Sequence, residues 1–406
     1  MDFAYSARTQ AYLARVKDFI REHIDPIADD VYQFMHEHNG HGDWHNWQLH
    51  PEVERLKLVA RNQGLANLFL PDAQLGQGLT TLEYAPLAEE MGRYLFASEI
   101  FNCNAPDTGN MEVLYHFGSD EQKTEWLAPL LKGDIRSVFG MTEPAVASSD
   151  ATNMQSEIKF DGDNIVINGH KWWSTGLGHP NAKVMIFMGL SNPENDRHAR
   201  HSMVIVPLDT PGLTIKRMLT AYGDYDAPYG HGEVTFENVV VPRSNLIMGE
   251  GKGFAIAQGR LGPGRIHHCM RSIGCAEQAL KLGIERALSR TAFGKPIIEL
   301  GGNKERIAKA RMQIEQARLL TLQAAWKIDN LGVKNAMTDI SAIKVVVPQM
   351  LEDVVDMAIQ LHGGGGMCND FPLARFMAGA RSLRLADGPD EVHMSMVSRL
   401  ELNQYR

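Results

Sequence analysis

The chain has 406 residues and a formal net charge of −9, with 44% hydrophobic and 22% charged residues. These values describe a globular protein too long for one simple core, so we expect two or three domains or one multilayered unit. The negative charge argues against a nucleic-acid binder, which would need a basic face, although a few local arginines could still bind a phosphate-bearing ligand.

Residues 1–132 have the spacing of amphipathic helices. Apolar side chains recur at three- and four-residue intervals, most clearly in 12–20, 56–63, 82–91 and 111–117. The tract 36–50 holds five histidines. It favours a solvated loop with helix ends; a metal site is the alternative, without supporting cysteines or ordered carboxylates.

Between 133 and 245 the apolar period changes to two. Alternating segments follow one another without intervening helices, and Asp161-Gly162 and Asn168-Gly169 have the composition of hairpin turns. We expect strands at 157–160, 165–167, 171–173, 184–188, 202–207, 213–218 and 233–241. This pattern predicts an antiparallel β-domain. No Gly-x-Gly-x-x-Gly follows a strand, which argues against a Rossmann nucleotide site.

Residues 246–406 return to a helical period, with long segments at 265–288, 306–331 and 339–361. Pro348 should kink or break the last of these. The triplet Gly262-Pro-Gly264 should interrupt a helix and leave backbone groups for water, side chains or a ligand. The predicted fold class is therefore α+β, with a helical domain at 1–132, a β-domain at 133–245 and a second helical domain at 246–406.

Cysteine content and the two ends of the chain bear on the compartment. Four cysteines without a Cys-x-x-Cys pair fit free thiols in a reducing environment. No apolar stretch approaches a membrane span in length. The first ten residues resemble neither a signal nor a transit peptide, and Asn-Gln-Tyr-Arg is not a peroxisomal address. We expect a cytoplasmic protein without a membrane span.

Asp387 is the main candidate for acid–base chemistry. It lies between two helical stretches, 375–384 and 392–402, and Gly388 follows it directly. A carboxylate at such a junction could be directed into a cleft as a general base. An acidic residue before Gly-Pro is also a common turn former, and that alternative stays open.

Two polar clusters could bind a ligand from the β-domain. Thr142-Glu143-Pro144, followed by Ser148 and Ser149, offers hydroxyl and N–H groups to a planar polar ligand or a phosphate, or forms a turn. Trp172 and Trp173 would point to opposite faces of a strand, so one of them could pack on an aromatic ring system beside Ser174 and Thr175. A plain core aromatic is the alternative.

The C-terminal region offers further candidates. Arg290, with Phe293 and Gly294, ends a helix and could cap carbonyls or bind a diphosphate in bidentate fashion. Four glycines, 363–366, exceed what a helix cap needs and favour close approach of the backbone to an anion. Arg265 could face the same cleft as Asp387, where a cation would favour the ionised carboxylate and burial would oppose it.

Five motifs in this order resemble the acyl-CoA dehydrogenase family over nearly the whole chain. They are Met-Thr-Glu-Pro with Ser-Ser-Asp (141–150), Asn-Gly-His-Lys-Trp-Trp-Ser-Thr-Gly (168–176), Asn-Val-Val-Val-Pro-Arg-Ser-Asn-Leu-Ile-Met-Gly-Glu-Gly-Lys-Gly-Phe (238–254), Arg-Thr-Ala-Phe-Gly-Lys-Pro (290–296) and Gln-Leu-His-Gly-Gly-Gly-Gly (360–366). Gly-Pro-Gly-Arg-Ile-His-His and Ala-Asp-Gly-Pro-Asp-Glu-Val-His are most similar to the branch of family members 10 and 11.

The resemblance implies a helical–β–helical fold with a four-helix-bundle-like C-terminal domain, an FAD in each subunit and a homotetramer built as a dimer of dimers. Implied FAD contacts within one subunit are Phe139, Met141, Thr142, Ser148, Ser149, Trp173, Ser174, Thr175, Pro389 and Glu391. Implied contacts to the neighbouring subunit's FAD are Arg290, Phe293, Gln360, Gly363 and Gly364. Ser149, Arg265 and Gly388 would border the acyl-CoA.

The implied reaction is α,β-dehydrogenation of an acyl-CoA thioester within fatty acid metabolism or β-oxidation. Asp387 would remove the α-proton while the β-hydrogen leaves as hydride to the flavin, and the thioester carbonyl would be hydrogen-bonded by an FAD ribityl hydroxyl and the backbone N–H of Asp387. Most of the family has Glu there, and the shorter Asp puts activity on plain acyl-CoAs in question. Some branches carry a base before the arginine instead, where this chain has Gly264. The loop 142–150 also has an extra residue and lacks the usual glycines.

Two other functions remain open. A nitroalkane-oxidase-like enzyme would share the fold and an Asp base but pair that base with an arginine seven residues later, where this chain has Met394. A catalytically quiet acyl-CoA- or FAD-binding scaffold is the other. For a dehydrogenase, the resemblance implies electron-transferring flavoprotein as the acceptor and a medium- or long-chain, branched or hydroxylated acyl group.

Overall fold

The computed structural model describes residues 4–406, except for the side chains of 260–263. Its contacts divide the chain into two compact units. The helical unit comprises Met1–Gln33, Leu58–Phe101 and Gly262–Arg406, and the sheet unit comprises Phe34–Lys57 and Asn102–Leu261. The three domain boundaries expected from the sequence stay a prediction.

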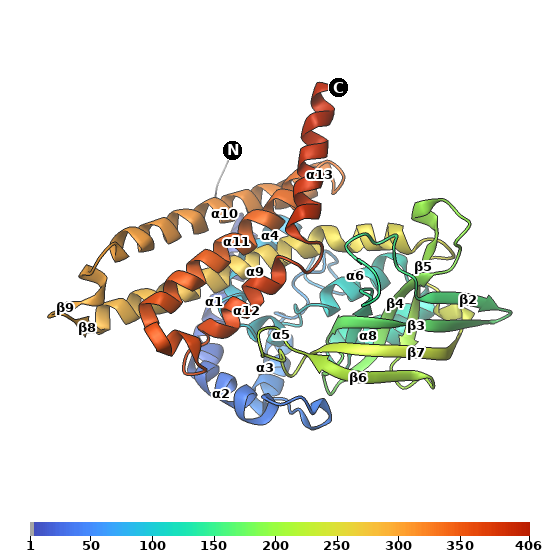
Figure 1. The fold of residues 1–406 in the computed structure, drawn as a ribbon, viewed down its shortest axis with the longest axis horizontal. Helices are drawn as coiled ribbons and strands as arrows, with labels where there is room; N and C mark the ends of the chain where they lie inside the picture. The colour runs from blue at the N-terminus through green and yellow to red at the C-terminus, as the bar shows by residue number, and fades with distance from the viewer. Residues whose placement is uncertain (1–3) are drawn as a thin grey trace. The chain divides into compact units, whose positions relative to one another are not determined.

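Long helices form the helical unit, and α10 and α11 lie side by side in it (Figure 1). The helices at the start of the chain are α1 (Ala7–Phe19), α2 (Ala28–Asn39), α3 (Pro51–Asn62), α4 (Thr81–Met91) and α5 (Ala97–Ile100). The residues of α2 and α3 are divided between the two units. The later ones are α9 (Gly253–Ser289), α10 (Asn303–Leu331), α11 (Met337–His362), α12 (Leu373–Leu383) and α13 (Asp390–Leu402). Helix α11 packs against α10, α12 and α13, so it forms the centre of this unit.

Local sequence explains how these helices begin and pack. At the start of α4, Thr80 and Glu83 form a reciprocal capping box. The Asp329 carboxylate of α10 accepts the N–H groups of Thr81 and Leu82, which places a negative charge at the N-terminus of α4. Helix α11 buries an apolar stripe at three- and four-residue spacing, including Ile340, Ile343, Val347, Met350 and Val354.

Two predicted helix breaks fall inside helices. The kink or break expected at Pro348 does not end α11, which continues from Met337 to His362. The bounds of α9 include Gly262-Pro-Gly264, and the side chains of this stretch up to 263 lie outside the described residues. Tertiary packing around a central helix can outweigh a single proline, which removes one backbone hydrogen bond.

The sheet unit holds a seven-stranded sheet of order β1-β4-β2-β3-β7-β6, with β5 paired to β4. Its strands are β1 (Arg136–Gly140), β2 (Glu157–Asp161), β3 (Asn164–Thr175), β4 (Ala182–Leu190), β5 (His201–Pro207), β6 (Leu213–Leu219) and β7 (His231–Pro242). Short helices precede it: α6 (Asp107–Phe117), α7 (Asp120–Gln122), η4 (Lys123–Leu127) and α8 (Ala128–Lys132). Side chains such as Phe187 and Phe236, in contact at 4.8 Å between ring centroids, form its core.

The sheet departs from the predicted antiparallel pattern in two ways. Strand β1, which the sequence did not predict, pairs in parallel with β4, and β2 also pairs in parallel with β4. Asn168-Gly169 is not a turn but a register shift inside β3. There Asn168 accepts the N–H of Asn238, and a Cβ on Gly169 would lie 2.3 Å from Ser156 Oγ. Glycine is therefore needed for close approach of the backbone.

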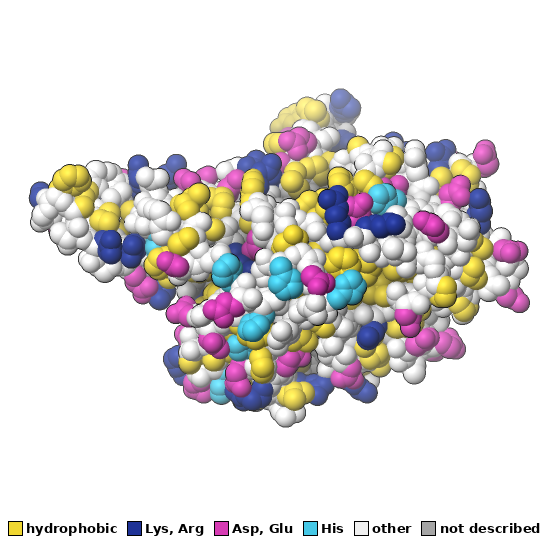
Figure 2. Space-filling view, turned by 60° about the horizontal axis from the view of Figure 1, so that its bottom comes forward, with side chains coloured by type: hydrophobic (Ala, Val, Ile, Leu, Met, Phe, Trp, Pro, Cys, Tyr) yellow, Lys and Arg dark blue, Asp and Glu magenta, His cyan; other side chains and the backbone are white. Residues whose placement is uncertain are grey.

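The predicted α+β class is confirmed, with helices at both ends of the chain and a sheet between them. The face drawn in Figure 2 intersperses acidic and basic side chains and shows no large basic field. Among the described residues, no helix combines the length and apolar character that crossing a membrane requires.

Candidate active site

A buried ion pair fixes the loop between β1 and β2. Lys171 Nζ lies 2.7 Å from Glu143 Oε1 and donates to the carbonyl of Met141 at 2.8 Å. The same carboxylate accepts the N–H groups of Gln155 and Ser156 at 2.8 and 3.0 Å. The start of the loop 141–156 is thereby attached to Lys171 and its end to Glu143, and the ion pair joins the two.

Burial and charge act on this pair in opposite directions. Burial lowers the pKa of Lys171 to about 8, although Glu143 favours the charged amine. For Glu143, burial alone would raise the pKa, but Lys171 and the two backbone donors outweigh it and the pKa is lowered. The carboxylate of Glu143 is therefore ionised at neutral pH.

The predicted ligand residues at the end of β1 and in this loop differ in exposure. Phe139 and Met141 are half-buried, and Ser149 is exposed. Ser148 Oγ accepts the N–H of Glu143 at 2.9 Å, so this hydroxyl shapes the loop itself. The carbonyl of Thr142 accepts a hydrogen bond from the N–H of Trp172 in β3.

A bulge in β3 determines the backbone conformation at Trp172 and Trp173. The pairing with β7 shifts between Lys171 and Ser174, and the N–H of Trp172 donates to Thr142 at 3.0 Å. Trp173 has φ of +52° and 41% of its surface exposed. The plain alternation expected of a strand is therefore interrupted here.

The bulge leaves groups that suit a planar polar ligand. Trp172 Nε1 and Ser174 Oγ are buried without a hydrogen-bond partner among the described residues. Thr175 Oγ1 is hydrogen-bonded to His231 Nδ1 at 3.0 Å, and the Trp173 indole lies beside the same imidazole. An exposed indole beside the imidazole that holds the Thr175 hydroxyl fits the ring system of a flavin.

In the helical unit, Asp387 occupies a strained turn between α12 and α13. Asp387 has φ of +55° and Gly388 has φ of +100°. Arg265 Nη2 and His393 Nε2 both lie 3.2 Å from the carbonyl oxygen of Asp387 and donate to it. Pro389 is the N-cap of α13. A non-glycine residue in this conformation persists only when its surroundings hold it, which points to function.

The Asp387 carboxylate faces a histidine that the sequence analysis did not assign. His268 Nε2 lies 3.3 Å from Asp387 Oδ2. On the other side, the buried Lys344 of α11 donates to the carbonyl of Leu383 at the end of α12. His268 lies within the Gly-Pro-Gly-Arg-Ile-His-His motif, and Lys344 is a lone charge in an apolar stripe. Both signals were available in the sequence.

A second group of predicted residues lies at the other end of α12. Phe293 and Gly294, with φ of +51° and +75°, form the two-residue turn between β8 (Thr291–Ala292) and β9 (Lys295–Pro296). This hairpin projects from one tip of the helical unit (Figure 1), and Phe293 is 94% exposed. Arg290 precedes it and is also exposed.

The glycine run lies near this hairpin. Gly363, with φ of +62°, starts the short helix η8 (Gly363–Met367), and both Gly364 and the preceding Gln360 are exposed. A Cβ on Gly365 would lie 4.0 Å from Arg286 near the end of α9. The eleven residues of α12, about 16 Å of helix, separate this group from Asp387.

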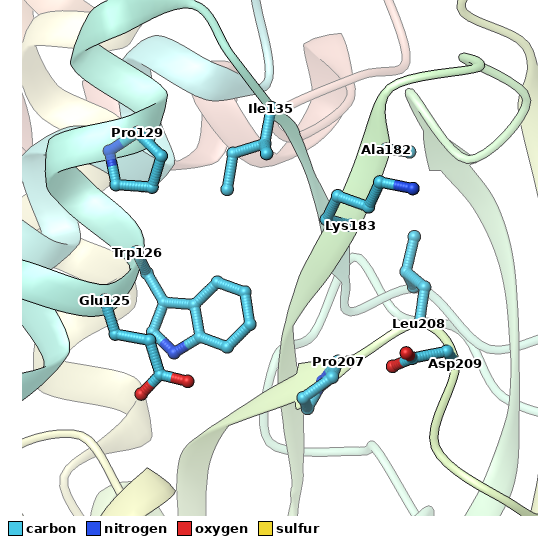
Figure 3. Close-up of a pocket in the computed structure, with 9 residues that line it drawn as sticks. All are labelled: Glu125, Trp126, Pro129, Ile135, Ala182, Lys183, Pro207, Leu208 and Asp209. Atoms are coloured by element: carbon cyan, nitrogen blue, oxygen red, sulfur yellow. The ribbon is translucent and has the colours of Figure 1, made fainter.

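A cavity of about 540 Å³ in the sheet unit lies apart from the predicted residues. Figure 3 shows side chains from η4, α8, the residue before β1, β4, and the end of β5 with the two residues after it. These side chains line the cavity: Glu125, Trp126, Pro129, Ile135, Ala182, Lys183, Pro207, Leu208 and Asp209. Its opposed charges and single indole form no recognisable catalytic arrangement. Within residues 4–406, no three His, Cys, Asp or Glu side chains converge on a metal position.

Comparison with known families gives three successive matches along the chain. Residues 6–134 match the acyl-CoA dehydrogenase N-terminal domain, 138–239 the middle domain and 251–401 the C-terminal domain. A Mycobacterium tuberculosis protein named probable acyl-CoA dehydrogenase FadE2 is 50% identical, and the alignment covers 100% of this chain and 98% of the relative. Acyl-CoA dehydrogenase family member 11 of Gallus gallus is 52% identical over 98% of this chain but only 51% of the relative.

The chain thus spans about half the length of the family member 11 proteins it matches, and 36% of family member 10 of Mus musculus, to which it is 52% identical. Among solved structures, a Mycobacterium abscessus protein described as a candidate acyl-CoA dehydrogenase is 58% identical, with a TM-score of 0.97 and full coverage of both chains. Butyryl-CoA dehydrogenase from Megasphaera elsdenii is 26% identical, with a TM-score of 0.80 over 99% of this chain and 100% of its own. These matches confirm the resemblance to the branch of members 10 and 11 and support an FAD cofactor. The chain belongs to the acyl-CoA dehydrogenase family.

Proposed function

We propose that this chain is an FAD-dependent dehydrogenase that oxidises an acyl-CoA thioester to the 2-enoyl-CoA, with Asp387 as the base. The observation that carries this proposal is the strained turn of Asp387, whose carbonyl oxygen is held by Arg265 and His393 at 3.2 Å. Such a turn costs conformational energy and fixes the direction of one carboxylate, which is what removal of an α-proton requires.

The chain's own residues have separable tasks in this proposal. Asp387 takes the α-proton onto a carboxylate oxygen, and Arg265 and Gly388 border the thioester. When bound, FAD supplies the acceptor for the β-hydrogen. In the sheet unit, Trp173 offers an aromatic face to the ring system and Ser174 and Thr175 offer hydroxyl groups, while the Glu143–Lys171 pair keeps the loop 141–156 in shape.

The remaining residues proposed to contact FAD from the sheet unit lie at or near the loop held by the Glu143–Lys171 pair. Phe139 lies in β1, and Met141, Thr142, Ser148 and Ser149 lie in the loop that this ion pair fixes. Ser149 is exposed enough to contact the acyl-CoA as well. In the helical unit, Pro389 is the N-cap of α13 and Glu391 lies in its first turn, and the family resemblance assigns both to FAD.

We also propose that the chain works as a homo-oligomer, a dimer of dimers. Arg290, Phe293, Gln360, Gly363 and Gly364 lie about one helix length from Asp387 in the same unit. We assign them to the FAD of a neighbouring subunit, because the family resemblance implies that role for them. Phe293, almost fully exposed at the hairpin tip, suits burial against another chain.

Substrate and electron acceptor are inferred from the family. A medium- or long-chain, branched or hydroxylated acyl group follows from similarity to members 10 and 11, and electron-transferring flavoprotein is the proposed acceptor. Fatty acid β-oxidation in the cytoplasm is the corresponding setting.

The test is an anaerobic titration of the purified, FAD-loaded protein with acyl-CoAs of graded length and branching. Loss of the oxidised flavin absorbance with one class of thioester supports the proposal and identifies the substrate class. A bound flavin that no acyl-CoA reduces contradicts it. Reduction by a nitroalkane instead would favour the oxidase, and no reduction by either would favour the quiet scaffold.

A further inference from the structure

The imidazole of His268 links an arginine to the Asp387 carboxylate. His268 Nε2 lies 3.3 Å from Asp387 Oδ2, and Arg271 Nη2 lies 3.2 Å from His268 Nδ1. The side chains of His268 and Asp387 are 23% and 25% exposed, so solvent competes only in part. All three residues belong to the helical unit.

These two contacts determine the tautomer of the ring. A guanidinium group has five N–H donors and no acceptor, so Nδ1 of His268 must accept the hydrogen bond from Arg271. The proton of a neutral imidazole then resides on Nε2, from which it is donated to Asp387 Oδ2. The direction of donation is therefore fixed along Arg271, His268 and Asp387.

The surroundings keep this imidazole neutral. Burial lowers the pKa of His268 below 6.5, Arg271 and Lys344 lower it further, and Asp387 opposes them. The charged and titratable groups that face the pair come from three helices: Arg265, His267, Cys269 and Arg271 of α9, Lys344 of α11, and Asp390 and His393 of α13. Of these, Cys269 and His393 are neutral at pH 7, because burial raises the pKa of the thiol to about 12 and lowers that of the imidazole to about 4.

We propose that His268 is the positioning residue of Asp387: its neutral imidazole donates from Nε2 to the carboxylate, and Arg271 holds the imidazole in that orientation. The inference rests on the proposed role of Asp387 as base. Arg265 and His393 fix the backbone carbonyl of Asp387, and His268 fixes the rotation of its side chain. A short aspartate has little reach, so both constraints are needed to direct it at one carbon.

The same contact stabilises the ionised base without transferring a proton to it. A hydrogen bond to the charged form of a carboxylate favours that form. Since the ring stays neutral, the carboxylate remains able to accept the α-proton at neutral pH. Loss of the donor should therefore affect both the rate of proton removal and the acid side of its pH dependence.

The experiment compares H268L, which removes the donor, with H268Q, which keeps an amide donor at the ε position. Single-turnover flavin reduction by the acyl-CoA that reduces the wild type should be roughly 10²-fold slower in H268L, with the acid limb of its pH profile moved to higher pH. H268Q should recover to within about tenfold. The binding constant of the acyl-CoA should change little, which separates loss of orientation from loss of binding.

H267Q is the matched control on the same helix. His267 is buried between the rings of Phe69 and Tyr84 and makes no contact with Asp387 in the described residues. Its replacement should leave the pH profile in place even if stability falls. Wild-type reduction rates in H268L, or equal losses in H268L and H268Q, would overturn the inference.

A measurement independent of turnover keeps the inference separate from the proposed function. Solid-state ¹⁵N NMR of histidine-labelled protein at pH 8, assigned by the signal missing in H268Q, should show a protonated Nε2 and an unprotonated Nδ1 for His268. The Nε2 signal should shift in D387N. A proton on Nδ1 would overturn the inference even if every acyl-CoA reduced the enzyme, and the expected tautomer would support it even if none did.

Discussion

Lys171 Nζ and Glu143 Oε1 lie 2.7 Å apart with 0% and 4% of their side chains exposed. This pair joins strand β3 to a loop that leaves the sheet at Met141 and returns at Ser156. Two buried charges gain little over an apolar pair in stability, because desolvation offsets their attraction. Their value here is geometric, since they hold the loop that carries the proposed flavin contacts.

Breaking this pair should be severe. E143Q leaves the Lys171 ammonium buried without its counter-charge, and removal of one partner typically costs about 3–5 kcal/mol in the free energy of unfolding. Urea unfolding should show this loss, and the variant should release FAD more readily. The double variant E143L/K171M removes both charges and should recover much of the stability but not the tight FAD binding. Wild-type stability in E143Q would contradict this role.

Replacing the base should separate chemistry from folding. D387N keeps the size of the side chain and removes the carboxylate, so FAD should stay bound while flavin reduction by acyl-CoA falls by about 10²- to 10⁴-fold. Stopped-flow absorbance under anaerobic conditions measures this rate. E401Q, which changes an exposed carboxylate on the following helix α13, is the control for loss of one negative charge. Fast reduction in D387N would place the base elsewhere.

Sequence periodicity predicted the helices and most strands because each buries one regular face. It predicted the pattern in 265–288 and 306–331 well, since long helices repeat their signal over many turns. It missed β1, whose five residues carry too little pattern and whose parallel partner β4 is far along the chain. It also read Asn168-Gly169 as a turn, because the same residues favour turns and bulges.

The sequence predicted those residues of the candidate site that lie in recognisable short motifs. Asp387 and Trp173 were found through short motifs, but their positive φ angles were not, since nothing in a sequence shows which residue a fold will strain. His268 and Lys344 were missed because their roles depend on contacts between α9, α11 and the turn after α12. Such contacts join residues distant in sequence, so the motif around His268 and the lone charge of Lys344 marked the two residues without showing what they contact.

Arg290 offers a test of the second ligand group. If it binds a diphosphate in bidentate fashion, R290Q should weaken FAD binding by roughly 10- to 100-fold, since a hydrogen bond to a charged group contributes about 1.5–3 kcal/mol. R290K should rescue it only in part, because a lysine lacks the planar fork. K295Q on strand β9 removes a neighbouring charge and should have little effect. FAD release followed by fluorescence distinguishes these cases, and equal binding in R290Q and the wild type would contradict the assignment.

An exposed apolar stripe on helix α10 predicts an interface between chains. Met312, Leu319 and Trp326 are exposed and spaced by seven residues, so they form one apolar stripe on its surface. The variant M312K/L319K should disrupt assembly while leaving each chain folded, because the substituted side chains already face solvent within one chain. Sedimentation velocity measures the assembly state. Unchanged sedimentation would remove α10 from the interface.

The imidazole of His393 should make stability depend on pH. Burial lowers its pKa from 6.5 to about 4, with Arg265 and Lys344 acting in the same direction. Between pH 4 and pH 6.5, His393 binds a proton in the unfolded chain but not in the folded protein. Its contribution to the free energy of unfolding is therefore complete above pH 6.5 and is lost as the pH falls toward 4.

The slope of that loss is at most about 1.4 kcal/mol per pH unit for a single group. Urea unfolding of the wild type and H393Q at several pH values isolates it, because glutamine does not titrate and the difference between the two proteins removes the other acids and histidines. The difference should shrink steadily between pH 6.5 and 4. Parallel curves for H393Q and the wild type would mean that His393 has the same pKa in the folded and unfolded protein. It would then be protonated below pH 6.5 and would not count among the neutral groups near Asp387 at low pH.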